Sequence, residues 1–403
     1  MSVYRDSPRQ RLEEVVEHLR SQGPALRVGT GERAAIVHRA LESVGRDPTL
    51  AARSAPTAGL SEPMAAWALR TTLEPATRAR LEQLAQAPLA AQHGERPVSL
   101  AAVVLAGNVF TAALRAVATP LLFGVPTLVK AASRGDEVLR AFAEALEPPL
   151  RDALAVVTFP RDDARAAALL GSAEVVHVHG NDESVRRMRD LASPGALVLP
   201  HGHGVGVALV FPDGLTYDER QAAMDSLAAD VAAYDGRGCL SPLRVHVVGS
   251  ATRAIECADR LHHALGRLER DLPRGPLPEA IAGRQMQWRG LAAATGTLFE
   301  GPAHAVAVEE DAPLPFAPGY RNVSVHAVGD EAAFLAAVRP LGAHLKCVGV
   351  AGEKLGAIAS ALDHAPALVP RVCPLGTMQT PPFDLWPEAL PPWTGLYRRL
   401  ETR

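Results

Sequence analysis

Cysteine is scarce in this 403-residue chain, and so is any excess of one charge. The four cysteines are widely spaced, at Cys239, Cys257, Cys347 and Cys373. They form no Cys-x-x-Cys pair, which argues against a metal knuckle or a secreted disulfide framework. With 41 basic and 44 acidic side chains the formal net charge is −3, which argues against a dedicated nucleic-acid binder. We expect reduced thiols in a cytoplasmic protein, so the reactivity of each cysteine has to be considered.

A long apolar run is missing as well. The most apolar stretch, residues 100–129, is interrupted by Asn108, Arg115 and two prolines, whereas a membrane span needs about 20 uninterrupted apolar residues. The N-terminus is charged from Arg5 onward, unlike a signal peptide. A composition of 48% hydrophobic and 21% charged residues is typical of a folded protein with a large core. We therefore expect a folded chain without a membrane span.

From Val98 onward, short apolar runs alternate with stretches of helical spacing. The first series has predicted strands at residues 100–105, 127–129, 155–159, 174–178 and 196–199, and helices at 109–122, 162–170 and 183–191. The second has strands at 244–248, 305–308, 322–328 and 345–350, and helices at 217–234 and 251–272. This alternation indicates βαβ units and parallel sheets covered on both faces.

Changes in the residue pattern along the sequence divide the chain into four segments. Residues 1–97 are mostly helical in spacing, residues 98–232 and 233–380 hold the two strand–helix series, and residues 381–403 form a tail. The segment Gly29–Ala34 fits a GxGxxA pattern, but the residues before it do not have the pattern of a strand. We interpret Thr30 there as the start of a helix, with a dinucleotide loop as the alternative.

Cys239 has the surroundings of a nucleophile. Gly236 and Gly238 allow close approach of a ligand, and Pro242 prevents a helix from starting in the loop. A thiol placed so can be exposed and can share an oxyanion site with its own backbone N–H. A buried cysteine in a turn is the alternative. Cys257 and Cys347 fall within a predicted helix and strand and are expected in the core, whereas Cys373 is open to either interpretation.

Three motifs in order carry a family resemblance. The segment GRGCLSP at Gly236–Pro242 resembles the nucleophile loop of the aldehyde dehydrogenase superfamily. Upstream, AGNVF at 106–110, PLLFG at 120–124 and LVK at 128–130 resemble its asparagine turn, the following helix and its cofactor lysine. The blocks AGNVF, CLSP and RVCPLGTMQTPPFDLW (371–386) are similar to the LuxC-like acyl-CoA reductases of bacterial luminescence. This resemblance spans roughly residues 98–386.

The resemblance implies an α/β, aldehyde-dehydrogenase-like fold. Residues 98–232 would form a Rossmann-type nicotinamide-binding domain and residues 233–380 an α/β catalytic domain that carries the nucleophile. Residues 1–97 would pack on the cofactor domain, and residues 381–403 would return to it or to an oligomer interface. Ligand sites at domain interfaces are common, so we expect Cys239 to face a cleft.

The resemblance also implies a reaction, the NADPH-dependent reduction of an acyl thioester to an aldehyde. Cys239 would form a thioester with the acyl group, which hydride transfer then resolves. The Asn108 amide and the Cys239 N–H would hold the developing oxyanion. Without the resemblance, Asn108 is equally well interpreted as a cap of the helix that follows it.

A set of further residues is implied at the cofactor: Gly107, Lys130, Ser133, Arg134, Gly180, Asn181, His201 and Gly202. Oxidising relatives usually have a glutamate where Ser133 stands. Because a carboxylate repels a 2′-phosphate and Arg134 attracts one, we expect NADPH, with NADH possible. A solvated turn at Ser133–Asp136 is the alternative. Gly180 lies at the expected pyrophosphate turn.

Histidines follow two of the predicted strands. His177 with His179, and His201 with His203, are spaced so that each pair lies on one strand face. They could bind zinc, but no cysteine or carboxylate completes a recognised pattern, so we expect no metal. The segment Leu199–Gly204 replaces the loop whose glutamate activates water in hydrolytic relatives. This favours a reductase, although His201 or His203 could act as a base.

Several alternatives remain open. They are an NAD(P)-dependent aldehyde dehydrogenase that forms free acid, an acyl-phosphate reductase using Arg237 and Arg244, and a catalytically silent scaffold subunit. The resemblance implies acyl-CoA or an acyl carrier as donor, an acyl-activating partner enzyme and a homo-oligomer. It does not fix the acyl chain.

Overall fold

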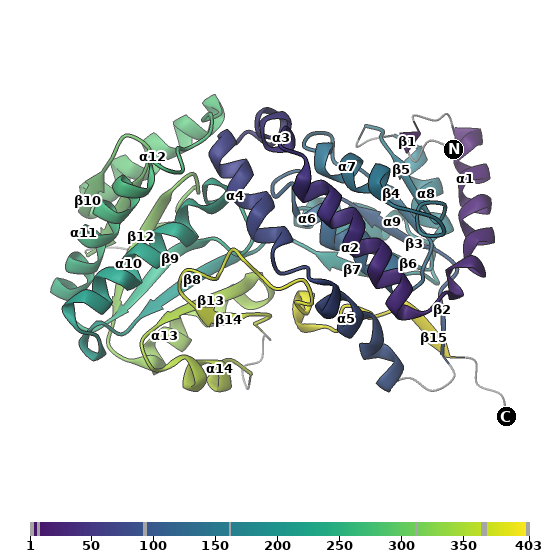
Figure 1. Ribbon diagram of the computed structural model, residues 1–403. Coiled ribbons are helices and arrows are strands. Elements are labelled where there is room, and N and C mark those ends of the chain that lie inside the picture. Colours follow the sequence, from purple (N-terminus) through teal and green to yellow (C-terminus); the bar gives the residue numbers. More distant parts are fainter. Residues whose placement is uncertain are drawn as a thin grey trace. The chain divides into compact units, whose positions relative to one another are not determined.

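The computed structural model describes residues 4–5, 9–91, 95–160, 163–310, 313–363 and 369–399. The chain folds into two compact units (Figure 1). The first unit comprises residues 1–58, 69–203 and 382–403, and the second comprises residues 59–68 and 204–381. Within the described ranges, no helix combines the length and the apolar composition that a membrane crossing needs.

The first unit is built on a six-stranded sheet. Its strands are β1 (Tyr4–Arg5), β3 (Ala101–Val104), β4 (Thr127–Lys130), β5 (Leu154–Val157), β6 (Val175–His179) and β7 (Leu197–His201). They are all parallel, in the order β1-β5-β4-β3-β6-β7. Every residue of β3 and β5 is buried, because helices cover both faces. The prediction of a parallel sheet made from βαβ units is confirmed here.

Helices form a layer on each face of this sheet (Figure 1). One layer contains α1 (Arg9–Gln22), α8 (Arg165–Ser172) and α9 (Asp182–Leu191). The other contains α6 (Ala112–Leu122) and α7 (Glu137–Ala145), over which α2 (Thr30–Arg46) packs. The remaining helices are α3 (Leu50–Ala58), α5 (Arg78–Ala91) and α4 (Glu62–Leu73), and α4 contains one border between the units. The cap of α2 is Gly29 without a side-chain bond, so the helix includes Thr30 rather than being capped by it.

The C-terminal tail belongs to the first unit. Strand β15 (Tyr397–Arg399) pairs antiparallel with β2 (Glu95–Pro97). The Tyr397 hydroxyl donates to the Phe123 carbonyl over 3.0 Å, and the Trp393 ring meets the Phe123 ring edge-on. These contacts join the tail to the turn that follows α6.

The second unit contains a seven-stranded sheet. Its strands are β8 (Val205–Val210), β9 (Pro242–Val248), β10 (Gly296–Glu300), β11 (Ala305–Glu309), β12 (Asn322–Val328), β13 (Leu345–Ala351) and β14 (Val372–Pro374). The order is β10-β11-β12-β9-β8-β13-β14, and among these described strands β10 alone is antiparallel to its neighbour. Strand β8 was not predicted, and it places the border after His203 instead of near Ala232. The physical reason is that β8 pairs with β9 and with β13.

In the described part of the second unit, five helices cover this sheet. They are α10 (Tyr217–Ala232), α11 (Ala251–Leu268), α12 (Glu279–Thr295), α13 (Glu331–Val338) and α14 (Leu355–Asp363). Helices α10 and α11 pack on one face through a core that includes Leu227, Leu261 and Val325. Helices α13 and α14 cover the other face around Phe334 and Ile358, and Trp288 of α12 packs there beside β11.

Candidate functional site

The order of strands in the first unit creates a switch point between β3 and β6. The chain runs outward from β3 through β4 to β5, and then returns to the other side of β3 for β6 and β7. In doubly wound sheets, ligands bind outside the carboxyl ends of the strands at such a point. The turns after β3 and β6, which contain Gly107 and Gly180, lie there.

All the residues expected at the cofactor follow neighbouring strands of this sheet. Gly107 follows β3, Lys130 ends β4, Gly180 follows β6 and His201 ends β7. Because the strands are parallel, the structure brings these residues to one carboxyl edge. This shared edge supports the expected set as a group.

The turns after β3 and β4 touch. A Cβ atom on Gly107 would lie 3.0 Å from the carbonyl oxygen of Arg134, so the two loops leave room only for glycine or a small local shift. Ser133 and Arg134 are exposed, and Gly135 is left-handed with a φ of 73°. The ammonium of Lys130 lies over the Phe159 ring, 5.8 Å from its centroid. This end of β4 therefore presents two exposed side chains beside the Gly107 turn.

Asn108 is not the cap of the next helix. The cap position of α6 is Thr111, and the helix begins at Ala112. Asn108 is exposed in the turn between β3 and that helix. The structure thus places Thr111 rather than Asn108 at the cap position of α6, and the role of Asn108 as an oxyanion donor stays a prediction.

Asn181, in contrast, is a helix cap. Its Oδ1 accepts from the Ser184 N–H over 2.9 Å at the start of α9. The Gly180 N–H donates to the His201 carbonyl over 3.3 Å, which joins the turn after β6 to the end of β7. A Cβ on Gly202 would lie 3.4 Å from a carboxylate oxygen of Asp182, so the segment after β7 also borders α9.

Three histidines stack at the ends of β6 and β7. His177 Nδ1 lies 3.1 Å from His201 Nε2, and the His179 and His201 rings stack with centroids 4.4 Å apart. Burial lowers the pKa of His177 to about 4 and that of His179 to about 3, and the neighbouring Arg115 charge also lowers the latter. Both imidazoles are therefore neutral at pH 7. His203 is exposed beyond them.

These histidines do not form a metal site. Among the described residues, no three His, Cys, Asp or Glu side chains are arranged to hold a metal ion. The rings instead pack face to face, with ring nitrogens of His177 and His201 directed at one another.

Cys239 lies in a tight turn of the second unit. Its thiol is exposed, and the turn is closed by the Ser241 N–H donating to the Gly238 carbonyl over 3.1 Å. Buried Ser241 is held from two sides, since its carbonyl accepts from Gly206 and its hydroxyl from the Gln379 amide over 3.1 Å. Because β9 begins at Pro242, the turn lies at the amino end of that strand.

The other three thiols are buried. Cys257 lies in α11, and burial raises its pKa to about 11. Cys347 and Cys373 lie on neighbouring strands with their Sγ atoms 3.7 Å apart, and burial raises the pKa of Cys347. Cys373 is thus a core residue, and the prediction that Cys257 and Cys347 lie in the core is confirmed.

Arg237 and Arg244 are engaged with the protein itself. The Arg237 guanidinium donates to the Tyr234 carbonyl over 3.0 Å and lies over the Tyr320 ring. Arg244 forms an ion pair with Glu309 at 3.0 Å and donates to Ser324. The Glu309 side chain is only 3% exposed, so it forms a buried ion pair with Arg244 at the end of β11.

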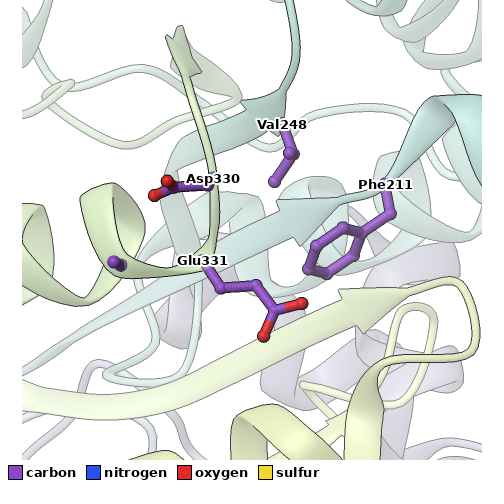
Figure 2. A pocket seen from close by; sticks show the side chains of 5 residues that line it. Phe211, Val248, Asp330 and Glu331 are labelled. Carbon is purple, nitrogen blue, oxygen red and sulfur yellow. The ribbon is translucent and has the colours of Figure 1, made fainter.

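A surface hollow of about 390 Å³ lies at the opposite end of the second sheet. Figure 2 shows Phe211, Val248, Asp330 and Glu331 around it. Phe211 follows β8, Val248 ends β9 and Asp330 follows β12, so the hollow is at the carboxyl edge. Asp330 caps α13, and Glu331 pairs with Lys354 at 3.1 Å. The hollow and Cys239 therefore flank the two ends of β9.

Sequence reasoning missed a buried ion pair beside the Cys239 loop. Arg321 donates to Asp235 through Nε over 3.0 Å and through Nη2 over 2.8 Å, although 86 positions separate the two residues. The only local signal was a glycine in each partner's turn, Gly236 and Gly319. Pairing across such a separation cannot be inferred from one sequence.

Comparison with known proteins adds family and fold. Residues 65–382 match the family described as acyl-CoA reductase (LuxC), while no curated protein sequence matches the chain. A NAD-dependent benzaldehyde dehydrogenase from Corynebacterium glutamicum has a TM-score of 0.70 at 17% identity, over 94% of this chain and 89% of that one. An aldehyde dehydrogenase from Physcomitrella patens, in complex with the reaction product succinate, has a TM-score of 0.72 at 18% identity, over 91% and 82%.

A third solved structure, an oxidoreductase from Marinobacter aquaeolei, has a TM-score of 0.74 at 16% identity over 91% of this chain and 83% of that one. At such low identities these structures establish the fold alone, and they confirm the expected aldehyde-dehydrogenase-like architecture. The family match covers most of the sequence and confirms the resemblance carried by the Asn108, Lys130 and Cys239 motifs. The chain therefore belongs to the LuxC family of acyl-CoA reductases, which makes it an oxidoreductase.

Proposed function

We propose that the protein reduces an acyl thioester to an aldehyde with NADPH, through an acyl-enzyme on Cys239. The single observation that carries this proposal is the exposed thiol of Cys239 in a closed turn, while the other three thiols are buried. A nucleophilic cysteine has to be accessible, and buried thiols are inert. Family membership supports the acyl-CoA class of substrate.

The proposed chemistry proceeds in two stages. The Cys239 thiolate attacks the acyl carbon, the donor thiolate leaves, and a thioester to the enzyme remains. A bound reduced nicotinamide would supply the hydride for the second stage. The Cys239 sulfur then leaves the tetrahedral carbon as thiolate, which releases the aldehyde. Asn108 and the Cys239 N–H are the proposed oxyanion donors in both stages.

The carboxyl edge of the first unit fits a dinucleotide. It lies at a topological switch point, and the Gly107 turn permits a close backbone approach. Lys130, Gly180 and Asn181 would line this edge together with His201 and Gly202. Exposed Ser133 and Arg134 would meet a 2′-phosphate, which favours NADPH, with NADH the alternative. The similar benzaldehyde dehydrogenase, in contrast, is described as NAD-dependent.

The alternatives receive less support. An acyl-phosphate reductase would need a free basic pocket near Cys239, but Arg244 is paired with Glu309 and Arg237 is bonded to Tyr234. A hydrolytic dehydrogenase would need a base at His201 or His203, yet His201 stacks on His179. A silent scaffold would not need an exposed cysteine. The proposal extends to a homo-oligomer in the cytoplasm, supplied by an acyl-activating partner.

The test is NADPH consumption with a panel of acyl-CoAs, with the aldehyde trapped and identified. We expect turnover by the wild type, none by Cys239→Ala, and nearly full activity for the matched control Cys257→Ala, whose thiol is buried. Free acid as product would support the hydrolytic alternative. An active Cys239→Ala variant would contradict the proposal.

A further inference from the structure

The residues that precede Cys239 have an unfavourable backbone conformation. Directly after α10, Tyr234 and Asp235 have φ values of 51° and 55°, and Gly236 follows at 66°. Left-handed conformations are disfavoured for residues with a Cβ and normally occur singly. Two such residues in a row persist only where the surrounding structure holds them.

A second left-handed turn packs against the first. Gly319, Tyr320 and Arg321 have φ values of 71°, 52° and 65° just before β12. A Cβ on Gly319 would lie 2.9 Å from the carbonyl oxygen of Gly236, so the two backbones are in direct contact. The turns therefore hold one another through backbone atoms.

A buried ion pair joins the two turns. The Arg321 guanidinium is 1% exposed and donates twice to Asp235, which is fully buried and also accepts from the Gly275 N–H over 3.0 Å. Arg321 Nη1 donates to Glu269 over 2.5 Å and to the Leu272 carbonyl over 2.7 Å. Several donors of the guanidinium are thus satisfied by protein acceptors, as a buried charge requires.

The geometry points to Asp235 and Arg321 as positioning residues for the nucleophile, a conclusion that rests on the proposed function of Cys239. The pair holds the left-handed run, which sets the direction in which the chain leaves α10. Tyr234 accepts from the Arg237 backbone N–H over 3.2 Å, so the held run continues into the Cys239 turn. Loosening the pair would misplace the thiol by a small amount, and catalysis is sensitive to such displacements.

Two variants loosen the pair and one serves as a control. Asp235→Asn keeps an acceptor, and asparagine tolerates the left-handed region, so the variant is expected to fold. Arg321→Lys keeps the charge but loses the two-fold contact. The matched control, Glu269→Gln, changes another partner of the same guanidinium without touching the left-handed run.

Two measurements separate positioning from stability. The first is kcat and KM for acyl-CoA reduction. The second is the rate of iodoacetamide labelling of each cysteine, resolved by peptide mass spectrometry, in which buried Cys257 reports unfolding. We expect both variants to lower kcat at least tenfold with KM within threefold, and to change Cys239 labelling at least threefold. Cys257 labelling should stay slow, and Glu269→Gln should be within twofold of the wild type in every readout.

The labelling arm does not depend on the reaction, so the two hypotheses can fail separately. Unchanged kcat and unchanged Cys239 labelling in Asp235→Asn and Arg321→Lys would overturn the inference. Equal losses in Glu269→Gln would do so too, as would failure of both variants to fold, because the pair would then serve stability only. If Cys239→Ala remains active, the proposed function fails, while altered Cys239 labelling would still support positioning of the loop.

Discussion

The two units present their candidate residues at opposite ends of their strands. In the first unit, Gly107, Lys130, Gly180 and His201 lie at the carboxyl edge of a parallel sheet. In the second, Cys239 lies at the amino end of β9, while the hollow with Phe211 and Asp330 occupies the carboxyl edge. The general rule that ligands bind at carboxyl ends thus locates the first set and would have missed the nucleophile.

The difference lies in what holds each set. At the carboxyl edge of the first unit, the turns after β3, β4 and β6 are short and lead into helices α6, α7 and α9, so neighbouring strands are enough to gather the residues. The Cys239 turn depends on distant partners, Arg321 on one side and Gln379 on the other. We therefore expect substitutions at the carboxyl edge of the first unit's sheet to affect only their immediate surroundings. Substitutions around Cys239 are expected to affect the loop through long-range contacts.

The largest effect at the first edge is expected from Asn108→Ala. Losing one oxyanion donor typically lowers kcat by about 10²–10³-fold. Since Thr111 and not Asn108 occupies the cap position of α6, the midpoint of urea unfolding should hardly move. Steady-state kinetics and urea unfolding check both parts, and a kcat within threefold of the wild type would remove Asn108 from the oxyanion site.

Arg134→Glu should reverse the cofactor preference. Hydrogen bonds to a charged group contribute about 1.5–3 kcal/mol, so kcat/KM for NADPH should fall roughly 10- to 100-fold while that for NADH changes less. Arg140→Glu is the matched control, because Arg140 lies on α7 and pairs with Asp136. If the ratio of the two kcat/KM values is unchanged in Arg134→Glu, Ser133 and Arg134 form a solvated turn and do not contact the cofactor.

Acid should destabilise the histidine stack. The folded pKa values of His177 and His179 lie below the ordinary 6.5, so their contribution is complete above pH 6.5 and is lost as the pH falls toward 4 and 3. When the pH falls from 7 to 5, each of these histidines should lower the free energy of unfolding by on the order of 2 kcal/mol. His177→Asn should flatten this dependence in urea titrations, whereas His263→Asn, at an exposed position, should not. Equal slopes for the wild type and His177→Asn would contradict the assignment.

The smallest effect is expected at the second asparagine of the same edge. Asn181→Ala removes the cap of α9 and should cost about 1 kcal/mol of stability. Its kcat should stay within a few fold of the wild type, unlike that of Asn108→Ala. Thermal unfolding and steady-state kinetics of the two variants are compared. A kcat loss equal to that of Asn108→Ala would contradict the distinction between a helix cap at Asn181 and an oxyanion donor at Asn108.

Much of the fold follows from local patterns. Apolar runs predicted β3 and β6 to within two residues. Strand β3 is continuously apolar because both of its faces are covered. Strand β8 was not predicted, and Gly204 and Gly206 lie beside and within its start, where glycine weakens a strand pattern. With β8 missing, the border between the units was expected about thirty residues too late.

The candidate site was predictable in its residues but not in its supports. The motif around Cys239 singled out the exposed thiol, since glycine and proline mark the loop locally. Nothing local indicates that Asp235 meets Arg321, or that Asp230 of α10 accepts the N–H groups of Gly376 and Met378. Such contacts join segments far apart in sequence, and one sequence carries no record of them.

The most direct test of the central claim is mass spectrometry of the protein after incubation with an acyl-CoA in the absence of NADPH. The account predicts one added acyl group, located on the peptide that contains Cys239, absent in Cys239→Ala and released as aldehyde when NADPH is added. An acyl group on another residue, or steady NADPH consumption without any acylation of Cys239, would contradict it.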